Sequence, residues 1–173
     1  MEQKELFDLL NKHHLTLSSM ESLTGGLFAS TFTSIPGASA VFKGTVVAYN
    51  NSIKEQFGVK GQTLDVNGAI SAQCAKEMAA RASILFDSDV AISFTGNAGP
   101  SESEEKPVGL VFVGVKVGTR LYTYELHLHG ERNDIRRLCV SFGFKTIYEK
   151  VTEQYENISD NVAQESSVED NTL

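Results

Sequence analysis

The sequence predicts an α/β fold, a three-layer α/β/α sandwich with a mixed, mostly parallel sheet. Two observations support this prediction. Segments with helical apolar periodicity alternate with β-rich runs over the first two thirds of the chain, which is typical of strands connected through helices. Two later β-rich runs flank Gly118-Thr119, and this arrangement predicts a hairpin that adds antiparallel strands to the sheet.

The first half of the chain predicts two strands, each followed by a helix. Leu6, Leu9 and Leu10 share one face of the first helix, and Pro36 ends the second. Asn51 is the expected N-cap of a short third helix. The expected elements are a helix over 2–13, a strand over 15–19, a helix over 27–32, a strand over 41–49, a helix over 51–57 and a loop over 59–70.

The second half predicts a third strand, a hairpin and two longer helices. Ser71 is the expected N-cap of a helix that turns Ala75, Met78 and Ala82 inward, and Gly143 is a weak spot in the last helix. The expected elements are a helix over 71–86, a strand over 89–95, a glycine turn over 96–100, a mobile polar stretch over 101–106, strands over 109–117 and 121–128, and a helix over 130–154.

Length and charge predict one domain over residues 1–154 and an acidic, disordered tail over 155–173. The chain has 173 residues, and 41% hydrophobic with 21% charged residues is the balance of a soluble globular protein. Residues 156–173 contain five acidic residues and no Lys or Arg, so the tail carries most of the net charge of −7. An acidic chain without a basic face argues against DNA or RNA as a partner.

The same composition excludes several other classes of site and partner. No apolar run approaches the roughly 18 residues of a membrane helix, and the N-terminus lacks the pattern of a signal peptide, so we expect a cytoplasmic protein. Cys74 and Cys139 lack metal or redox spacing and are expected to pack as ordinary helix residues. His127 and His129 share a strand face without a third ligand, so no metal site is expected.

Two glycine-rich turns, over 22–26 and 95–100, follow predicted strands. The first amides of a helix are unpaired and its dipole favours negative charge, so a turn that leads into a helix is a natural anion site. Ligands of open α/β sheets bind outside the carboxyl ends of the strands. The two turns therefore predict a pocket, although ordinary connectors would have the same composition.

Within this predicted pocket, Ser22 is a candidate nucleophile. A serine hydroxyl needs a base, and no G-x-S-x-G motif surrounds Ser22. A lysine whose pKa is lowered by burial can be that base. Lys54 is a candidate, but residue chemistry alone does not distinguish it from the other lysines.

The last predicted helix offers candidate ligands for an anionic group. Arg132 and Arg136 are four residues apart and therefore share a helix face, where paired arginines suit a phosphate or carboxylate. The alternative is a solvated face on which Glu131 and Asp134 pair with the arginines.

Seven motifs in this order resemble those of the CinA C-terminal domain family, also called the competence-damage-inducible proteins. They cover roughly residues 1–152 and predict a stand-alone form of this domain, without the nucleotide-processing domain of longer CinA proteins. The motifs are M-E-S-L-T-G-G at 20–26, P-G-A-S-A-V-F at 36–42, G-T-V-V-A-Y-N-N-S-I-K at 44–54, G-A-I-S at 68–71, G-N-A-G-P at 96–100, E-K-P-V-G at 105–109 and G-E-R-N-D-I-R-R at 130–137.

The resemblance implies a nicotinamide mononucleotide (NMN) amidohydrolase of pyridine nucleotide salvage and NAD metabolism, which forms nicotinic acid mononucleotide and ammonia. It implies Ser22 as nucleophile, Lys54 as base, and Tyr49 as a proton relay or hydrogen-bond donor. It also implies a homo-oligomer, a dimer or higher, and no metal or organic cofactor. The residues implied to bind the substrate are Thr24, Gly25, Gly26, Asn51, Thr95, Gly96, Ala98, Gly99, Arg132, Arg136 and Arg137.

Backbone N–H groups near Gly25-Gly26 or Gly96 are the expected oxyanion donors. The sequence departs from the family pattern at Leu23, at Ser52, at Asn97 and over 101–104. These departures leave a second hypothesis open, a catalytically inactive nucleotide-binding or regulatory module of the same fold. A third hypothesis is an interaction protein whose partner binds the acidic tail.

Overall fold

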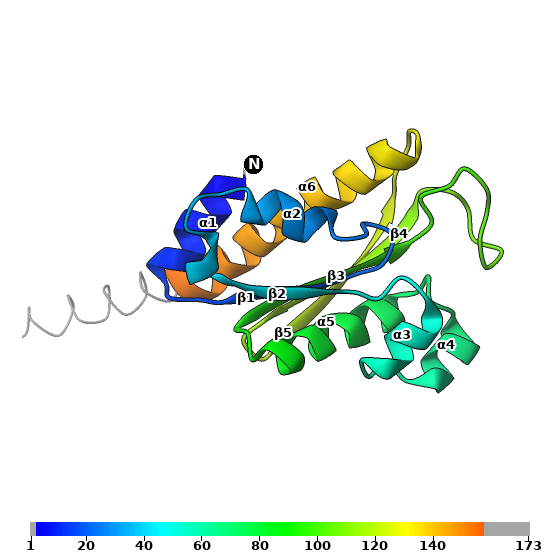
Figure 1. Ribbon diagram of the computed structural model, residues 1–173, viewed down its shortest axis with the longest axis horizontal. Helices are drawn as coiled ribbons and strands as arrows, with labels where there is room; N and C mark the ends of the chain where they lie inside the picture. The colour runs from blue at the N-terminus through cyan, green and yellow to red at the C-terminus, as the bar shows by residue number, and fades with distance from the viewer. Residues whose placement is uncertain (1–2, 158–173) are drawn as a thin grey trace, which may run out of the picture.

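A five-stranded sheet lies between two layers of helices in the computed structural model, which describes residues 3–157 (Figure 1). One face of the sheet is covered by α1 (Gln3–Lys12), α2 (Leu27–Thr33) and α6 (Arg132–Val151). The other layer contains α3 (Asn51–Gln56), α4 (Gly61–Asn67) and α5 (Ala72–Phe86), of which α5 packs along the sheet. The predicted three-layer α/β fold is confirmed.

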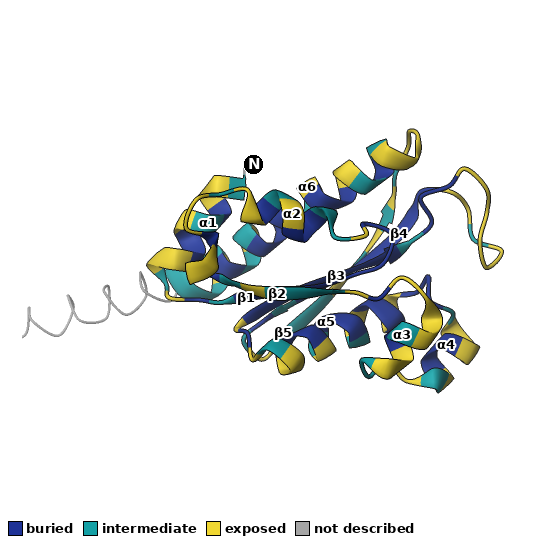
Figure 2. Ribbon diagram, in the orientation of Figure 1, coloured by how far each residue is buried: buried dark blue, intermediate teal, exposed yellow. Residues whose placement is uncertain are grey.

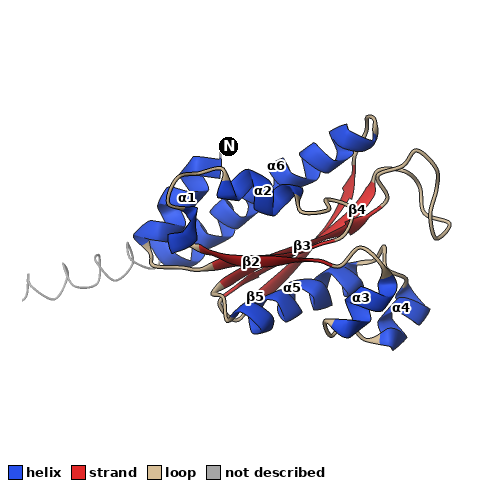
Figure 3. Ribbon diagram, viewed as in Figure 1, coloured by secondary structure: helices blue, strands red, loops and turns tan. Residues whose placement is uncertain are grey.

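The strands, red in Figure 3, form one mixed sheet, and their order is β2-β1-β3-β4-β5. β1 pairs in parallel with β2 and β3, whereas β4 pairs antiparallel with β3 and β5. The parallel part thus comes from the alternating segments and the antiparallel part from the predicted hairpin. The strands are β1 (Leu17–Glu21), β2 (Phe42–Val47), β3 (Val90–Gly96), β4 (Leu110–Val117) and β5 (Arg120–His127).

The carboxyl ends of the three parallel strands meet at one edge of the sheet. Ser22 directly follows β1, Tyr49 lies two residues after β2, and Asn97 directly follows β3. Because β1 lies between β2 and β3, the loops that leave these strands are neighbours and form a crevice.

Two hydrophobic cores flank the sheet, and buried residues line both of its faces (Figure 2). In the larger core, Phe28 of α2 lies 4.8 Å from Phe144 of α6 and 5.5 Å from Phe94 of β3, between ring centroids. In the second core, Met20 of β1 packs with Met78 of α5. β3 is buried on both faces, which explains its nearly continuous apolar sequence.

Gly143 marks a close approach of α6 to the sheet rather than an end of the helix. A Cβ atom at this position would lie 2.7 Å from Phe94 Cζ and 2.8 Å from Ile92 Cδ1. The predicted weak spot in the helix is therefore the point at which α6 can pack closely on β3.

One strand boundary and one helix cap differ from the sequence prediction. β1 begins at Leu17 and runs to Glu21, two residues later than expected, because Glu21 still pairs with both Val47 and Phe94. The N-cap of α3 is Asn50 rather than Asn51, since the Asn50 side chain accepts a hydrogen bond from Ser52 N at 3.0 Å.

α4 occupies a segment that was expected to be a loop. The start of this helix is held by Glu77 of α5, which accepts hydrogen bonds from Lys60 N at 2.8 Å and Thr63 Oγ1 at 2.6 Å. Such a contact between residues far apart in the sequence leaves no periodic signal.

The helical path of α6 continues into η2 (Thr152–Glu156), which passes the predicted domain end at 154. Lys12 Nζ donates a hydrogen bond to Glu156 at 2.7 Å and ties this end to α1. Residues 158–173, most of the predicted tail, lie outside the described residues. Within residues 3–157, no helix combines the length and apolar character needed to cross a membrane.

Candidate active site

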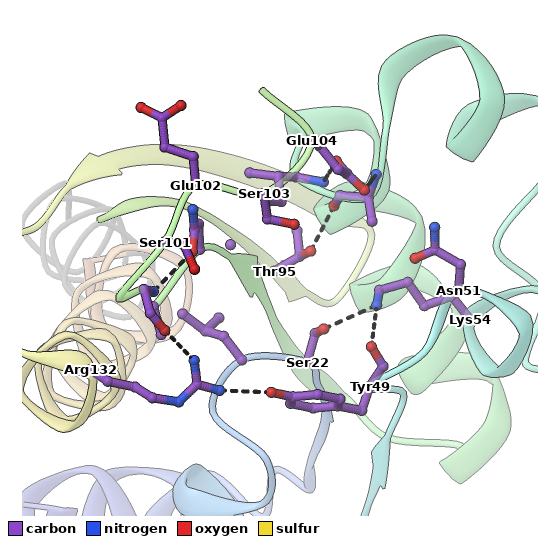
Figure 4. Close-up of a pocket in the computed structure, with 17 residues that line it drawn as sticks. Ser22, Tyr49, Asn51, Lys54, Thr95, Ser101, Glu102, Ser103, Glu104 and Arg132 are labelled. Atoms are coloured by element: carbon purple, nitrogen blue, oxygen red, sulfur yellow. Dashed lines mark hydrogen bonds between the residues drawn. The ribbon is translucent and has the colours of Figure 1, made fainter. Parts of the chain in front are cut away.

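A cavity of about 310 Å³ opens at the carboxyl ends of β1, β2 and β3 (Figure 4). Segments from five parts of the chain contribute to it. The lining residues are Ser22, Leu23, Tyr49, Asn51, Lys54, Ala69, Ile70, Thr95, Gly96, Asn97, Ala98, Gly99, Ser101, Glu102, Ser103, Glu104 and Arg132.

Ser22 and Lys54, the predicted nucleophile and base, lie in direct contact in this cavity. Lys54 Nζ donates a hydrogen bond to Ser22 Oγ at 3.0 Å and a second one to Tyr49 O at 3.2 Å. Ser22 is fixed by its position after β1, where its N–H donates to Phe94 O at 2.9 Å. Lys54 is held on α3, whose N-cap Asn50 starts the helix one turn earlier. The two side chains thus meet at the distance that a proton transfer requires.

The Lys54 amine is almost completely buried, with 1% of the residue exposed. Burial lowers the pKa of Lys54 because the charged form loses its hydration, and the Cys74 thiol and Glu104 carboxylate oppose this shift only in part. No carboxylate of residues 3–157 forms an ion pair with Lys54. The amine is therefore suited to lose its proton and act as a base.

Tyr49 joins the two sides of the cavity mouth. Its carbonyl accepts from Lys54, while its hydroxyl accepts a hydrogen bond from Arg132 Nη2 at 2.8 Å. Arg132 Nη1 donates in turn to Gly99 O. Ser22, Lys54, Tyr49 and Arg132 therefore form one hydrogen-bonded chain (Figure 4). The Tyr49 hydroxyl contacts Arg132 rather than the serine–lysine pair.

The N-terminus of α2 is occupied by a carboxylate of the chain itself, which corrects the predicted anion site over 22–26. Glu21 is fully buried and accepts hydrogen bonds from Gly26 N at 3.0 Å, Phe28 N at 3.2 Å and Ala29 N at 3.0 Å. Gly25 N donates to Ser22 O at 3.0 Å. The amides of Gly25 and Gly26 are thus engaged, so the expectation that they donate to an oxyanion is wrong, whereas Gly96, the other expected donor, lines the cavity.

The three arginines of the last helix have different partners. Only Arg132 lines the cavity. Arg136 donates through Nε to Leu23 O at 3.0 Å and through Nη2 to Thr24 O at 2.9 Å. Arg137 is exposed and donates to Asp134 Oδ1 at 2.9 Å, beside a neighbouring cleft of about 650 Å³. Of the expected phosphate ligands, Arg132 with either Arg136 or Arg137, only Arg132 therefore faces the cavity, and the solvated-face interpretation holds for Arg137.

A family comparison agrees with this arrangement. The sequence model of the CinA C-terminal domain matches residues 2–151. The chain belongs to the CinA C-terminal domain family.

Relatives of this CinA domain are similar in sequence and in structure. Competence-damage inducible proteins of Caldanaerobacter subterraneus and Bacillus cytotoxicus are 48% and 43% identical over 141 and 148 residues, or 80% and 84% of this chain. These stretches are 34% and 36% of the relatives, so the chain spans about a third of the length of the curated relatives it matches.

Solved structures of the superfamily have the same fold. The competence/damage inducible protein of Agrobacterium tumefaciens is 34% identical with a TM-score of 0.82, and covers 85% of this chain and 92% of its own. A CinA superfamily protein of Klebsiella pneumoniae is 25% identical with a TM-score of 0.85, and covers 87% of this chain and 96% of its own.

The departures of this CinA domain from the family pattern, except for Ser52, lie at the cavity wall. Asn97 Oδ1 accepts from Gly99 N at 2.9 Å, and Asn97 Nδ2 donates to Lys106 O at 3.2 Å. The asparagine thus fixes the turn that carries Gly99. Ser52 lies outside the cavity lining, and its N–H and hydroxyl both donate to Oδ1 of Asn50, the N-cap of α3.

The polar stretch 101–106 is attached across the cavity, whereas the sequence predicted a mobile segment. The Glu104 carboxylate accepts from Ala69 N at 3.1 Å and Ile70 N at 3.0 Å, in the turn before α5. Glu104 and Glu105 both have a left-handed backbone, with φ of 53° and 57°. Sequence reasoning missed this contact and the cavity residues Ala69 and Ile70, since no chemical feature of these side chains marks them.

Eight of the residues predicted to bind or react with substrate line the cavity together with Ser22. They are Tyr49, Asn51, Lys54, Thr95, Gly96, Ala98, Gly99 and Arg132. Thr24, Gly25, Gly26, Arg136 and Arg137 are not among its lining residues. Thr95 Oγ1 donates to Ala69 O at 2.6 Å and so ties the end of β3 to the same turn. Within residues 3–157, no three His, Cys, Asp or Glu side chains gather closely enough to bind a metal ion.

Proposed function

We propose that the chain is an amidohydrolase that converts NMN to nicotinic acid mononucleotide and ammonia, with Ser22 as nucleophile and Lys54 as base. The observation that carries this proposal is the 3.0 Å contact between Ser22 Oγ and the buried Lys54 amine. A serine next to a desolvated lysine is a known arrangement for attack on an amide carbonyl. Membership of the CinA family supports the same class of reaction.

In the acylation step, neutral Lys54 accepts the Ser22 proton while Oγ attacks the carboxamide carbon. The tetrahedral oxyanion then collapses, the C–N bond breaks, and the Lys54 ammonium returns the proton to the leaving ammonia. Water next enters, gives a proton to Lys54 and attacks the acyl-Ser22 ester. The proton returns to Ser22 as the acid leaves, so that one water is consumed for each ammonia released.

Charges around the cavity support an anionic substrate group. Arg132 donates only to Tyr49 Oη and Gly99 O, and it has no ion-pair partner among residues 3–157. An arginine whose charge is not neutralised by a carboxylate suits a phosphate. In this proposal Arg132 binds the substrate phosphate. The Tyr49 carbonyl orients the Lys54 amine by accepting its hydrogen bond.

The test is ammonia release from NMN by the purified protein, compared with Ser22→Ala and Lys54→Ala. We expect either substitution to lower kcat by at least about 10³-fold, as for nucleophile and base removal in serine hydrolases. Ser52→Ala is the matched control, since that hydroxyl only donates to the Asn50 side chain, outside the cavity lining. Turnover that survives in Ser22→Ala would refute the assignment.

A second candidate is an inactive nucleotide-binding module, which the departures from the family pattern at Asn97 and over 101–104 favour, because these residues line the cavity. Glu102 and Glu104 line the cavity that also contains Arg132. The Glu104 carboxylate is nevertheless occupied by two amides, and in Figure 4 the Glu102 carboxylate points away from Lys54. NMN that binds without turnover in the wild type would support this module instead of the enzyme.

A further inference from the structure

The turn that follows Ser22 contains backbone donors without acceptors. Ser22 O accepts from Gly25 N, so residues 22–25 form a four-residue turn in which Leu23 and Thr24 are central. Within residues 3–157, neither Leu23 N nor Thr24 N has an acceptor. The Thr24 hydroxyl is also buried without a partner, although buried polar groups are normally paired. Leu23 lines the cavity beside Ser22.

Arg136 determines which way the central peptide of this turn faces. Its Nε and Nη2 hold the carbonyls of Leu23 and Thr24. Because a trans peptide is planar, the N–H of Thr24 points away from the side on which the Leu23 carbonyl meets Arg136. In the same way, the Leu23 N–H points away from the Ser22 carbonyl, which is bound to Gly25 N. Arg136 and Gly25 therefore hold the carbonyls of Leu23 and Ser22, and the N–H groups of Thr24 and Leu23 are left free on the opposite side of each peptide.

The partners of Arg136 are all neutral oxygens. Besides the two carbonyls, Nη1 donates to Asn133 Oδ1 at 2.9 Å. All three guanidinium nitrogens are thus engaged, and the side chain is not among the residues that line the cavity. A residue placed in this way can act on the reaction through the backbone that it holds, not through direct contact with a phosphate.

We propose that Arg136 is a positioning residue that holds the 22–25 turn, so that the N–H group of Leu23, which lines the cavity beside Ser22, binds the oxyanion formed when Ser22 attacks the amide. This inference rests on the proposed amidohydrolase function and replaces Gly25-Gly26 as the donors. The residue after a nucleophile at a strand-to-helix turn supplies such a donor in other serine hydrolases.

The first test compares Arg136→Lys with Arg137→Lys as matched control on the same helix. Lysine keeps the charge but cannot hold two carbonyls in a fork. We expect Arg136→Lys to lower kcat at least tenfold with KM within twofold, and to do so equally for NMN and for nicotinamide riboside, which lacks the phosphate. A KM increase confined to NMN would assign Arg136 to the phosphate and overturn the proposal, as would an unchanged kcat.

A second pair of variants tests the Leu23 amide directly. Leu23→Pro removes the N–H, and proline is favoured at the second position of a four-residue turn. Leu23→Ala shortens the side chain and keeps the N–H. We expect kcat of Leu23→Pro to be about 10²–10³-fold below that of Leu23→Ala, the usual effect of one oxyanion donor. Equal kcat values in two folded variants would overturn the proposal.

Failure of the proposed substrate can be recognised separately. If the wild type releases no ammonia from either compound, a fluorophosphonate probe with mass detection of Ser22 replaces turnover, since its phosphoryl oxygen needs the same donors. Slower labelling of Arg136→Lys than of Arg137→Lys would support the positioning role of Arg136 and reject only NMN as the substrate. Equal labelling rates, or no labelling of the wild type, would overturn the inference itself.

Discussion

The Lys54 amine lowers the stability of the fold because burial disfavours its charged form. Between the lowered pKa of Lys54 and its ordinary value of 10.5, the unfolded chain binds more protons, so stability rises with pH in that window. Lys54→Met keeps the length of the side chain without the charge. The two oxygens that lose their donor, Ser22 Oγ and Tyr49 O, belong to residues that line the cavity. We expect a higher Tm than the wild type at pH 7, a smaller difference at pH 10, and no turnover. A lower Tm at pH 7 would contradict this account.

The pH dependence of turnover follows from the same group. Lys54 accepts a proton only when neutral, so kcat should fall as the pH decreases through its pKa, which burial places below 10.5. The Glu104 carboxylate raises this pKa, so Glu104→Gln should move the inflection to lower pH. Glu55→Gln on the exposed side of α3 is the control. An inflection that does not move in Glu104→Gln would exclude Glu104 as an electrostatic partner.

The chemistry of single residues could be predicted where a motif carried it, but their partners could not. Ser22 and Lys54 were both expected, and they meet at 3.0 Å. Arg136 was expected to bind phosphate, yet it binds two carbonyls. A guanidinium can bind a phosphate or backbone carbonyls, so the sequence alone does not tell which of the two Arg136 contacts; the path of the backbone does.

Among the elements, α2 depends on the carboxylate of the strand that precedes it. Glu21 pairs with three amides at the start of this seven-residue helix. Glu21→Ala would leave these amides unpaired in a buried site, and we expect a loss of about 1–3 kcal/mol in the free energy of unfolding. Urea denaturation measures this loss, with exposed Glu5→Ala of α1 as control. Equal losses in the two variants would refute the role of Glu21 as a cap.

Elements with their own periodicity were predicted well, and those held by distant side chains were not. α5 begins at the expected N-cap, Ser71, which accepts from Cys74 N at 3.1 Å. α4 was missed because its cap, Glu77, lies on another helix. The strap over 101–106 was predicted to be mobile for the same reason, since its attachment depends on amides of Ala69 and Ile70.

In the molecule as a whole, Gly143 sets the distance between α6 and the sheet. Alanine favours a helix over glycine by about 1 kcal/mol, but here its Cβ would meet Phe94 and Ile92. We therefore expect Gly143→Ala to destabilise the fold by about 1–3 kcal/mol, as overpacking does. Gly61→Ala is the control, because its Cβ would lie 3.4 Å from the flexible Glu55 carboxylate and should be neutral or stabilising. Gly143→Ala with unchanged stability would show that α6 can move outward freely.

The position of α6 also determines when the chain can become active during its synthesis. Ser22 and Lys54 leave the ribosome early, whereas Arg132 and Arg136, which hold Tyr49 and the turn after Ser22, leave more than seventy residues later. Until then Phe28 lacks its contact with Phe144. A nascent chain therefore carries Ser22 and Lys54 before the residues that hold the cavity around them, and on the proposed function we expect hydrolysis only after the last helix has been synthesised.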